Sequence, residues 1–150
     1  RDLHSFPTRR SSDLITFEVN EITAATIVAR LHHVTADGFP WIVLEKEKTL
    51  LGYAYATKFR DREAYRYTAE STVYLDPGQT GRGYGAMLYR ELLDRLKHMG
   101  IHVVIGVVSL PNPASVRLHE SLGFEQTAHL RQVGFKFGQW IDVGDWQVIL

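Results

Sequence analysis

The stretch Ser71-Thr-Val-Tyr-Leu-Asp-Pro-Gly-Gln-Thr-Gly-Arg-Gly-Tyr-Gly-Ala86 decides the fold of this chain. Its first five residues predict a β-strand, the Asp-Pro pair is typical of a turn, and an amphipathic helix is predicted after the glycines. Gly81, Gly83 and Gly85 lack a Cβ, so a ligand is able to approach the backbone closely there. The loop leads into a helix N-terminus, whose unpaired N–H groups favour a phosphate. The stretch therefore predicts a site for a pyrophosphate.

Two common nucleotide-binding patterns do not fit this loop. It lacks the Gly-x-x-x-x-Gly-Lys-Ser/Thr spacing of an ATP-binding P-loop. It also lacks the Gly-x-Gly-x-x-Gly spacing, and the acidic residue about 20 positions later, of a dinucleotide-binding domain. The next predicted strand, residues 102–108, is followed by Ser109-Leu110 and offers no carboxylate for a ribose. A P-loop nucleotidase and a dinucleotide-dependent enzyme are therefore disfavoured.

Composition narrows the class of protein further. The chain has 150 residues, 45% of them hydrophobic, which suits one domain with a sizeable core. Its formal net charge is zero and its charges are interspersed, so we expect neither nucleic acid nor an anionic membrane as partner. The sequence contains no cysteine, which excludes disulfides and a thiol nucleophile. It also contains no apolar run of membrane-spanning length, and we expect a cytoplasmic protein.

Residues 1–14 differ in character from the rest of the chain. The segment from His4 to Leu14 is polar, contains Pro7 and two adjacent arginines, and has no hydrophobic periodicity. It resembles the conceptual translation of a sequencing-library adapter, and a natural disordered tail is the alternative. Both interpretations leave residues 15–150 as the folded domain, and the first implies that native N-terminal sequence has been lost.

Strands and helices alternate along the remaining sequence. Thr23 is a candidate N-cap for the first helix, Gly100 and Gly123 are expected to end the next two, and Asn112-Pro113 is expected to start the third. The apolar run 102–108 predicts a central strand covered on both faces. This order predicts an α/β domain on a mixed sheet. Strands are expected at residues 15–19, 39–45, 50–57, 65–75, 102–108, 124–135 and 143–150, with a charged turn at 46–48 and a connection at 136–142.

The loop Thr80-Gly-Arg-Gly-Tyr-Gly85 resembles the coenzyme A signature Arg/Gln-x-x-Gly-x-Gly/Ala of the GNAT N-acetyltransferases, with Thr80 in place of the usual Arg or Gln. Residues 67–74, 110–120 and 134–142 resemble the phosphinothricin N-acetyltransferase branch, and the similarity runs from about Thr16 to the C-terminus. The resemblance implies the GNAT fold, a twisted mixed sheet whose central parallel strands splay to admit the pantetheine arm. The strand and helix with which that fold usually begins are missing here.

The resemblance also assigns two catalytic residues. The acceptor amine is an ammonium at neutral pH and must lose a proton before it attacks. Glu70 stands on the strand before the glycine loop, where the branch has its general base; an exposed strand residue is the alternative. His119 stands where many GNAT enzymes have a Tyr that protonates the leaving thiolate, so it is expected to act as acid or proton relay. A histidine that is only hydrogen-bonded on a helix face is the alternative.

The cofactor acetyl-CoA is expected to contact three parts of the chain. The strand backbone of Val73, Tyr74 and Leu75 would pair with the pantetheine amides. Asn112 would contact the cofactor beyond the splayed strands, and it also suits a plain N-cap. Arg82 suits either a phosphate contact or a variable loop position. The glycine loop would contribute Gly81, Arg82, Gly83, Tyr84, Gly85 and Ala86.

Cations near aromatic residues are candidates for the acceptor site. Arg62, Tyr65 and Lys136 suit a small zwitterionic amino acid, although solvated surface charges are the alternative. Phe137 and Trp140 suit either this site or a homodimer interface in the C-terminal half. The resemblance thus implies an amino-acid N-acetyltransferase acting by direct attack on phosphinothricin, methionine sulfoximine or a related acceptor. A protein N-terminal acetyltransferase and a non-catalytic acyl-CoA-binding module are the alternatives, because loops set the acceptor.

Overall fold

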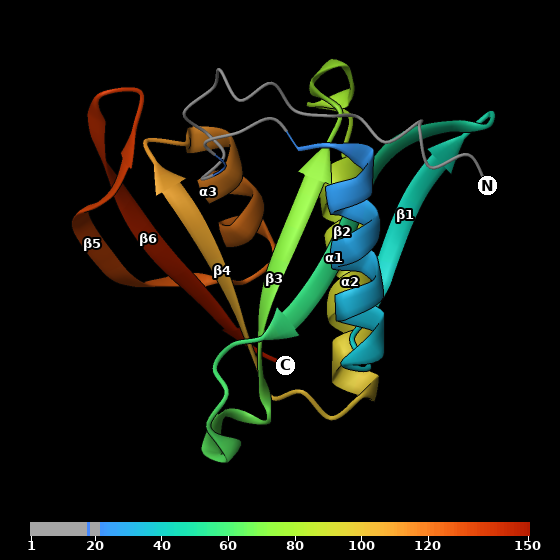
Figure 1. Ribbon diagram of the computed structural model, residues 1–150, viewed down its shortest axis with the longest axis horizontal. Helices are drawn as coiled ribbons and strands as arrows, with labels where there is room; N and C mark the ends of the chain where they lie inside the picture. The colour runs from blue at the N-terminus through green and yellow to red at the C-terminus, as the bar shows by residue number, and fades with distance from the viewer. Residues whose placement is uncertain (1–17, 19–21) are drawn as a thin grey trace.

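One twisted six-stranded sheet with helices on both faces builds the described part of the chain (Figure 1). The computed structural model describes residue 18 and residues 22–150, so the predicted tail 1–14 and all but one residue of the predicted strand 15–19 lie outside it. None of the described helices has the length and apolar character needed to cross a membrane. The elements are α1 (Ala24–Ala36), β1 (Trp41–Lys46), β2 (Thr49–Lys58), β3 (Thr68–Leu75), α2 (Tyr84–His98), β4 (Val103–Leu110), α3 (Pro113–Ser121), β5 (Glu125–Lys136) and β6 (Gln139–Ile149), with short 3₁₀ turns at Glu63–Tyr65 and Pro77–Gln79.

The sheet consists of two antiparallel halves joined by one parallel seam. Its strand order is β1-β2-β3-β4-β6-β5, and β3–β4 is the parallel pair among the described strands. The crossover from β3 to β4 runs through the glycine loop and α2, as a parallel pair requires. The predicted mixed α/β sheet is therefore confirmed.

The two faces of the sheet are identified by their contacts. On the α2–α3 face, Ser71 of β3 is hydrogen-bonded to Tyr89 of α2, and Gly106 of β4 adjoins His119 of α3. Successive strand residues point to opposite sides, so Glu70 belongs to the other face, which we call the α1 face. Figure 1 shows α1 in front of the sheet and α2 and α3 behind it.

The core lies on the α2–α3 face. Leu88, Leu92 and Leu96 recur at the four-residue spacing of one helical stripe, and all three are buried. They pack on strand residues of β2, β3 and β4, where alanines at 54, 56 and 69 let the helix approach closely. The buried cluster comprises Ile42, Ala54, Ala56, Ala69, Leu88, Tyr89, Leu92, Leu96, Ile101, Val104, Val108, Phe124 and Trp146.

Helix α1 covers only part of the opposite face. Thr23 caps it as predicted, since its hydroxyl accepts a hydrogen bond from the N–H of Thr26 at 3.2 Å. Its buried residues Ile27 and Val34 face β1 and β2, against which the helix packs. It does not extend over β4, where Val107 is 45% exposed. On the α1 face, the prediction of a strand covered on both faces therefore holds at Ile105, which is 7% exposed, and is wrong at Val107.

Two hairpins close with two-residue turns of left-handed backbone. Glu47 and Lys48 have φ of 50° and 66° between β1 and β2, and Phe137 and Gly138 have φ of 49° and 72° between β5 and β6. Such turns match the twist of antiparallel strands, so pairing continues right up to them. Strand β6 therefore begins at Gln139, and the predicted start at residue 143, after a connection at 136–142, is wrong.

Candidate active site

The glycine loop presents a helix N-terminus with an open backbone. Gly81 and Gly83 have φ of +76° and +79°, a conformation that side chains rarely adopt. Gly83 is the N-cap of α2, and the first turn of that helix contains no acidic residue. The first N–H groups of a helix have no partner within it. The N-terminal end of α2 is thus suited to bind an anion, as the sequence predicted.

Gly85 has a packing role that its spacing did not predict. A Cβ at this position would stand 3.1 Å from Cδ1 of Leu75 and 3.5 Å from Cδ2 of Leu118. Glycine here lets the first turn of α2 pack closely on β3 and α3. This packing fixes the position of the glycine loop. Of the other loop residues, Arg82 is exposed, while Tyr84 and Ala86 are half-buried.

The parallel seam is short, and the two strands separate beyond it. Pairing between β3 and β4 runs from Thr68 with Val103 to Ser71 with Gly106. Val73, Tyr74 and Leu75 continue the strand and pair with β2 on their other side. The β3–β4 ladder ends before them, at the pair Ser71 and Gly106. The expected splay is present, and it leads from the seam to the glycine loop.

Glu70 lies on the α1 face one residue before the splay. It pairs with Ile105 of β4 and with Thr57 of β2. Burial raises the pKa of its carboxyl group, and the negative charge of Asp145 on β6 raises that pKa further. A carboxylate whose pKa is shifted toward neutrality is a better general base than an exposed one. The alternative of an exposed strand residue does not describe this half-buried side chain.

His119 reaches the same seam from the opposite face. Its Nδ1 lies 2.7 Å from the carbonyl oxygen of Ser115, to which it donates, so Nε2 carries the lone pair of the neutral ring. Nε2 adjoins Gly106, where an added Cβ would stand only 2.3 Å away. The side chain is buried, and burial lowers its pKa. A neutral imidazole with this orientation accepts a proton at Nε2 before it is able to donate one.

A buried hydroxyl pair fixes the point where the strands part. Oγ of Ser71 lies 2.6 Å from the Tyr89 hydroxyl and donates to the carbonyl oxygen of Ile105 at 3.1 Å. Because Ser71 donates to that carbonyl, the hydrogen of Tyr89 points at Ser71. Burial raises the pKa of Tyr89, which keeps it protonated. Sequence reasoning missed these residues; the one available signal was a tyrosine next to the leucine stripe of α2.

Asn112 holds the start of α3. Its side-chain oxygen accepts a hydrogen bond from the N–H of Ser115 at 3.2 Å, and Pro113 occupies the first helical position. The plain N-cap role is confirmed. A cofactor contact from the same residue stays a prediction.

The predicted acceptor residues do not form one group. Arg62 and Tyr65 lie in the loop between β2 and β3, where a surface hollow of about 430 Å³ is lined by Arg60, Asp61, Arg62 and Tyr65. This loop precedes Thr68, at the Val103 end of the seam. Lys136 ends β5 beyond the Leu110 end of the sheet, is 3% exposed, and places Nζ 5.0 Å from the Phe137 ring. Arg62 and Tyr65 thus lie at the Val103 end of the sheet, and Lys136 lies at the Leu110 end.

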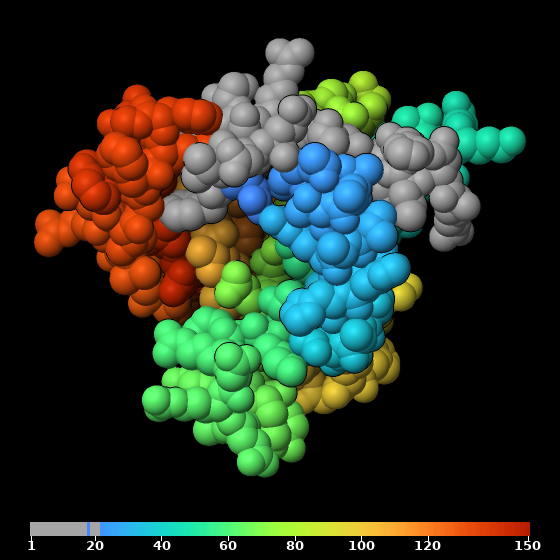
Figure 2. All heavy atoms as spheres, in the orientation of Figure 1, coloured from blue at the N-terminus to red at the C-terminus, as the bar shows by residue number. Residues whose placement is uncertain are grey.

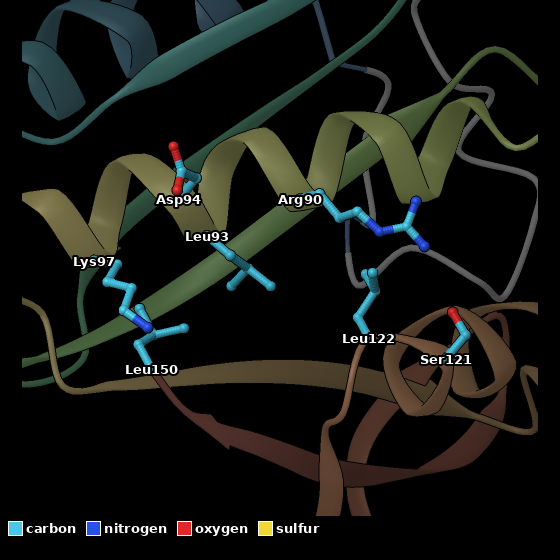
Figure 3. A pocket seen from close by; sticks show the side chains of 7 residues that line it. All are labelled: Arg90, Leu93, Asp94, Lys97, Ser121, Leu122 and Leu150. Atoms are coloured by element: carbon cyan, nitrogen blue, oxygen red, sulfur yellow. The ribbon is translucent and has the colours of Figure 1, made fainter.

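The space-filling view shows a hollow on the α1 face of the sheet (Figure 2). In Figure 2 the α1 face is hollowed between α1 and the β5–β6 hairpin, with atoms of β3 and β4 at the floor. A second hollow of about 390 Å³ lies between α2 and α3 on the other face. Figure 3 shows it bordered by Arg90, Asp94 and Lys97 of α2 and by Ser121 and Leu122. It is separated from Glu70 by the sheet.

The sequence of this chain is similar to those of known acetyltransferases. The sequence profile of the acetyltransferase (GNAT) family matches residues 8–124. The phosphinothricin N-acetyltransferase of Streptomyces viridochromogenes is 45% identical over 111 residues, covering 74% of this chain and 61% of that protein. The L-methionine sulfoximine/L-methionine sulfone acetyltransferase of Salmonella typhimurium is 42% identical over 106 residues, covering 71% of this chain and 62% of that protein. The chain thus spans about three fifths of the length of these curated relatives.

A solved structure agrees with the fold. The phosphinothricin acetyltransferase of Sinorhizobium meliloti, in complex with AcCoA, superposes with a TM-score of 0.87 at 36% identity, covering 93% of this chain and 76% of that one. The splayed seam, the glycine loop and the family match point to the same conclusion. The chain belongs to the acetyltransferase (GNAT) family.

Proposed function

We propose that the chain is an N-acetyltransferase that transfers the acetyl group of acetyl-CoA to the amino group of a small amino acid. The observation that carries the proposal is the position of the Glu70 carboxylate, whose pKa is raised. It lies where β3 and β4 begin to separate, and the gap between these strands leads to the first turn of α2, which suits an anion. The names of the relatives support an amino-acid acceptor such as phosphinothricin, methionine sulfoximine or methionine sulfone.

The residues present fit acetyl-CoA. Its pyrophosphate would lie on the N–H groups around Gly81, Gly83 and the first turn of α2, and the exposed Arg82 is free to turn toward the phosphates. Its pantetheine amides would pair with the backbone of residues 73–75, which lie beyond the last β3–β4 pair. Asn112 would border the same gap from the start of α3. When bound, the cofactor supplies the activated thioester carbonyl.

Glu70 acts as the general base in this proposal. It accepts a proton from the acceptor's ammonium, and the free amine then attacks the thioester carbonyl. A carbon–nitrogen bond forms, the carbon–sulfur bond breaks, and the thiolate leaves with the electron pair. The proton that the new amide nitrogen still has to lose goes to that thiolate. Burial assists this step because it raises the proton affinity of the carboxylate.

His119 serves the same reaction as a proton relay in this proposal. Its neutral ring offers the Nε2 lone pair at the seam, and its Nδ1–H is committed to Ser115. Burial disfavours a standing imidazolium. His119 therefore binds a proton only briefly, while it passes that proton to the leaving thiolate.

The acceptor would lie on the α1 face with its carboxylate toward the loop of Arg62 and Tyr65. The Arg60 guanidinium lies 4.8 Å from the Phe59 ring centre and 5.5 Å from that of Tyr65, which orders the cationic loop. The loop adjoins the Thr68 end of β3, two residues before Glu70. One small amino acid would then place its carboxylate toward Arg62 and its ammonium at Glu70. Lys136 is left out of the acceptor site because it lies at the opposite end of the sheet.

We further propose a cytoplasmic homodimer formed through the β5–β6 hairpin. Val133, Phe135, Phe137 and Trp140 are each more than half exposed there, and the rings of Phe135 and Trp140 lie 4.8 Å apart. Such an apolar patch on an edge hairpin suits a second copy of the chain. Sedimentation equilibrium of the wild type and Trp140→Ser checks this: a dimer that the substitution weakens supports it, and a wild-type monomer contradicts it.

An acetyl-CoA turnover assay over a panel of acceptors tests the function. We expect thiol release with phosphinothricin, methionine sulfoximine or methionine sulfone, and none with short peptides. Release with peptides alone would identify a protein N-terminal acetyltransferase. No release, with acetyl-CoA still raising the melting temperature, would identify a non-catalytic module. At a hundredfold excess over its dissociation constant, acetyl-CoA should stabilise the fold by about 2.7 kcal/mol, and NADH should not.

A further inference from the structure

A second carboxylate borders the seam on the face of Glu70. Asp145 of β6 pairs with Val107 of β4, and Glu70 of β3 pairs with Ile105 of the same strand. Gly106, between them, faces His119 on the other side. Ile105 and Val107 are therefore consecutive residues of the α1 face, and the two carboxylates flank one stretch of β4. Two strand spacings, about 10 Å, separate β3 from β6.

The Asp145 carboxylate faces an open part of the sheet. Val107 beside it is 45% exposed, because α1 does not cover β4. Across β5 its neighbour is Ala128, which offers no charge. Within residues 22–150 no hydrogen bond or ion pair is recorded for this carboxylate, whereas Asp142 on the same strand is bonded to His129 and to the N–H of Gln132. The Asp145 carboxylate is thus left to interact with a molecule that enters the hollow.

The other titratable groups near Glu70 lie on β2, on α1 and in the loop before β3, on the side of Glu70 away from β6. On β2, Tyr53 and Tyr55 share its face, and Arg30 of α1 lies within electrostatic reach of both while paired with Glu18. The loop before β3 contributes Arg60, Asp61, Arg62 and Glu63. Among the described residues, Asp145 is the one whose charge raises the pKa of Glu70. Asp61 and Glu63 balance Arg60 and Arg62 in the loop, and Glu18 balances Arg30, so Asp145 is the negative charge that β6 adds to this face.

We propose that Asp145 acts beside Glu70 as a second carboxylate that draws in the acceptor's ammonium and selects acceptors with an uncharged side chain over those with an anionic one. The inference rests on the proposed function and sharpens its acceptor class. An anionic group on the side chain of the acceptor is repelled by the charge of Asp145, whereas a neutral polar group is not. Methionine sulfone has a neutral side chain and phosphinothricin has an anionic phosphinate. We therefore expect methionine sulfone to be the better acceptor.

The charge of Asp145 also affects the proton chemistry of Glu70. A neighbouring negative charge favours the protonated form of a carboxyl group, so it raises the pKa of that group. The acid limb of kcat/KM reports the base in the free enzyme. Removal of the Asp145 charge should therefore move this limb to lower pH, an effect that a purely structural role would not produce.

The test compares kcat/KM for methionine sulfone and phosphinothricin in the full chain across the neutral pH range. In Asp145→Asn we expect the ratio to shift toward phosphinothricin by roughly three- to tenfold, mainly through KM, and the acid limb to move to lower pH. Asp145→Glu keeps the charge and should keep the wild-type ratio. Glu120→Gln removes an exposed carboxylate of α3, on the other face, and should change neither quantity.

Several outcomes would overturn the inference. An unchanged ratio in Asp145→Asn would overturn the inference and leave the proposed function intact. The same shift in Asp145→Glu or in Glu120→Gln would also overturn the inference. A wild type that acetylates neither amino acid removes the proposed function, and the inference with it. Asp145→Ser repeats the charge removal should the asparagine variant fail to fold.

Discussion

The two faces of the sheet differ in what they bury. The α2–α3 face is closed by apolar side chains such as Leu92 and Val104, each 0% exposed, and its polar groups Ser71 and Tyr89 bond to each other. The α1 face carries Glu70 and Asp145, whose charges repel, and the exposed Val107. The first face stabilises the fold, and the second carries two like charges that cost stability and to which we have assigned a catalytic role as a proposal. Substitutions on the two faces should therefore have separable effects.

The largest effect is expected from Glu70→Gln. This substitution keeps the shape of the side chain but removes the base, so turnover should fall by roughly 10²–10⁴. Stability should change in the other direction. The folded-state pKa of Glu70 is raised, so its contribution is fully favourable below the unfolded pKa and is lost as pH rises through the folded one. Glutamine avoids that loss, and the variant should melt higher than wild type at neutral pH. Steady-state kinetics and thermal melts check both; undiminished turnover would exclude Glu70 as the base.

On the α2–α3 face the expected effect is on stability alone. Leu92→Ala leaves a cavity under α2 and should lower the free energy of unfolding by about 2–5 kcal/mol. The neighbouring Leu93 is only partly buried, so Leu93→Ala should lower it by less. The folded fraction of Leu92→Ala should keep the wild-type Michaelis constants. Denaturant unfolding and kinetics below the melting temperature measure these quantities, and equal losses in both variants would contradict the packing argument.

Gly83→Ala should weaken cofactor binding more than it weakens the fold. Its φ of +79° makes alanine strained, at a cost of about 1 kcal/mol, and relief of that strain would turn the N–H groups of the loop away from a phosphate. Gly38→Ala is a matched control, because Gly38 has φ of +82° and open space around it but lies after α1. Only Gly83→Ala should reduce the melting shift caused by acetyl-CoA. A similar reduction in both variants would mean that the loop geometry does not bind the cofactor.

The smallest effect is expected at Asp142, whose pKa shift is opposite to that of Glu70. Hydrogen bonds from His129 at 2.7 Å and from the N–H of Gln132 at 2.9 Å lower the pKa of this carboxyl group. Its contribution to stability is therefore present above the unfolded pKa and lost as pH falls through the folded one. Asp142→Asn should melt slightly lower than wild type at neutral pH, and the difference should vanish in acid. A difference that grows in acid would reverse the assigned sign.

Local signals predicted the features that depend on neighbours in sequence. The N-caps Thr23 and Asn112, and the glycine loop that leads into the N-terminus of α2, follow from residue type at short spacing. The order of the helices and strands followed from hydrophobic periodicity. Glu70 and His119 came from the family resemblance, and the structure brings both to the seam.

Features that depend on strand register were not predictable in this way. The bond from Ser71 to Ile105 joins residues 34 positions apart, and only the parallel pairing brings them together. The approach of Asp145 to Glu70 depends on the placement of β6 beside β4. Lys136 looked like a partner of Arg62 because both are cations near aromatic rings, but the sheet places them at opposite ends. Charge and residue type do not report such distances.

The short parallel seam has a consequence for folding kinetics. Each antiparallel half of the sheet contains a hairpin whose contacts are local in sequence, whereas the seam needs a crossover through α2. Loop-closure entropy makes such non-local pairing slow. We therefore expect the halves to gain structure before the four pairs of the seam align. Because Glu70 and His119 meet only at the seam, the return of enzymatic activity would mark the last step of refolding, later than the return of secondary structure.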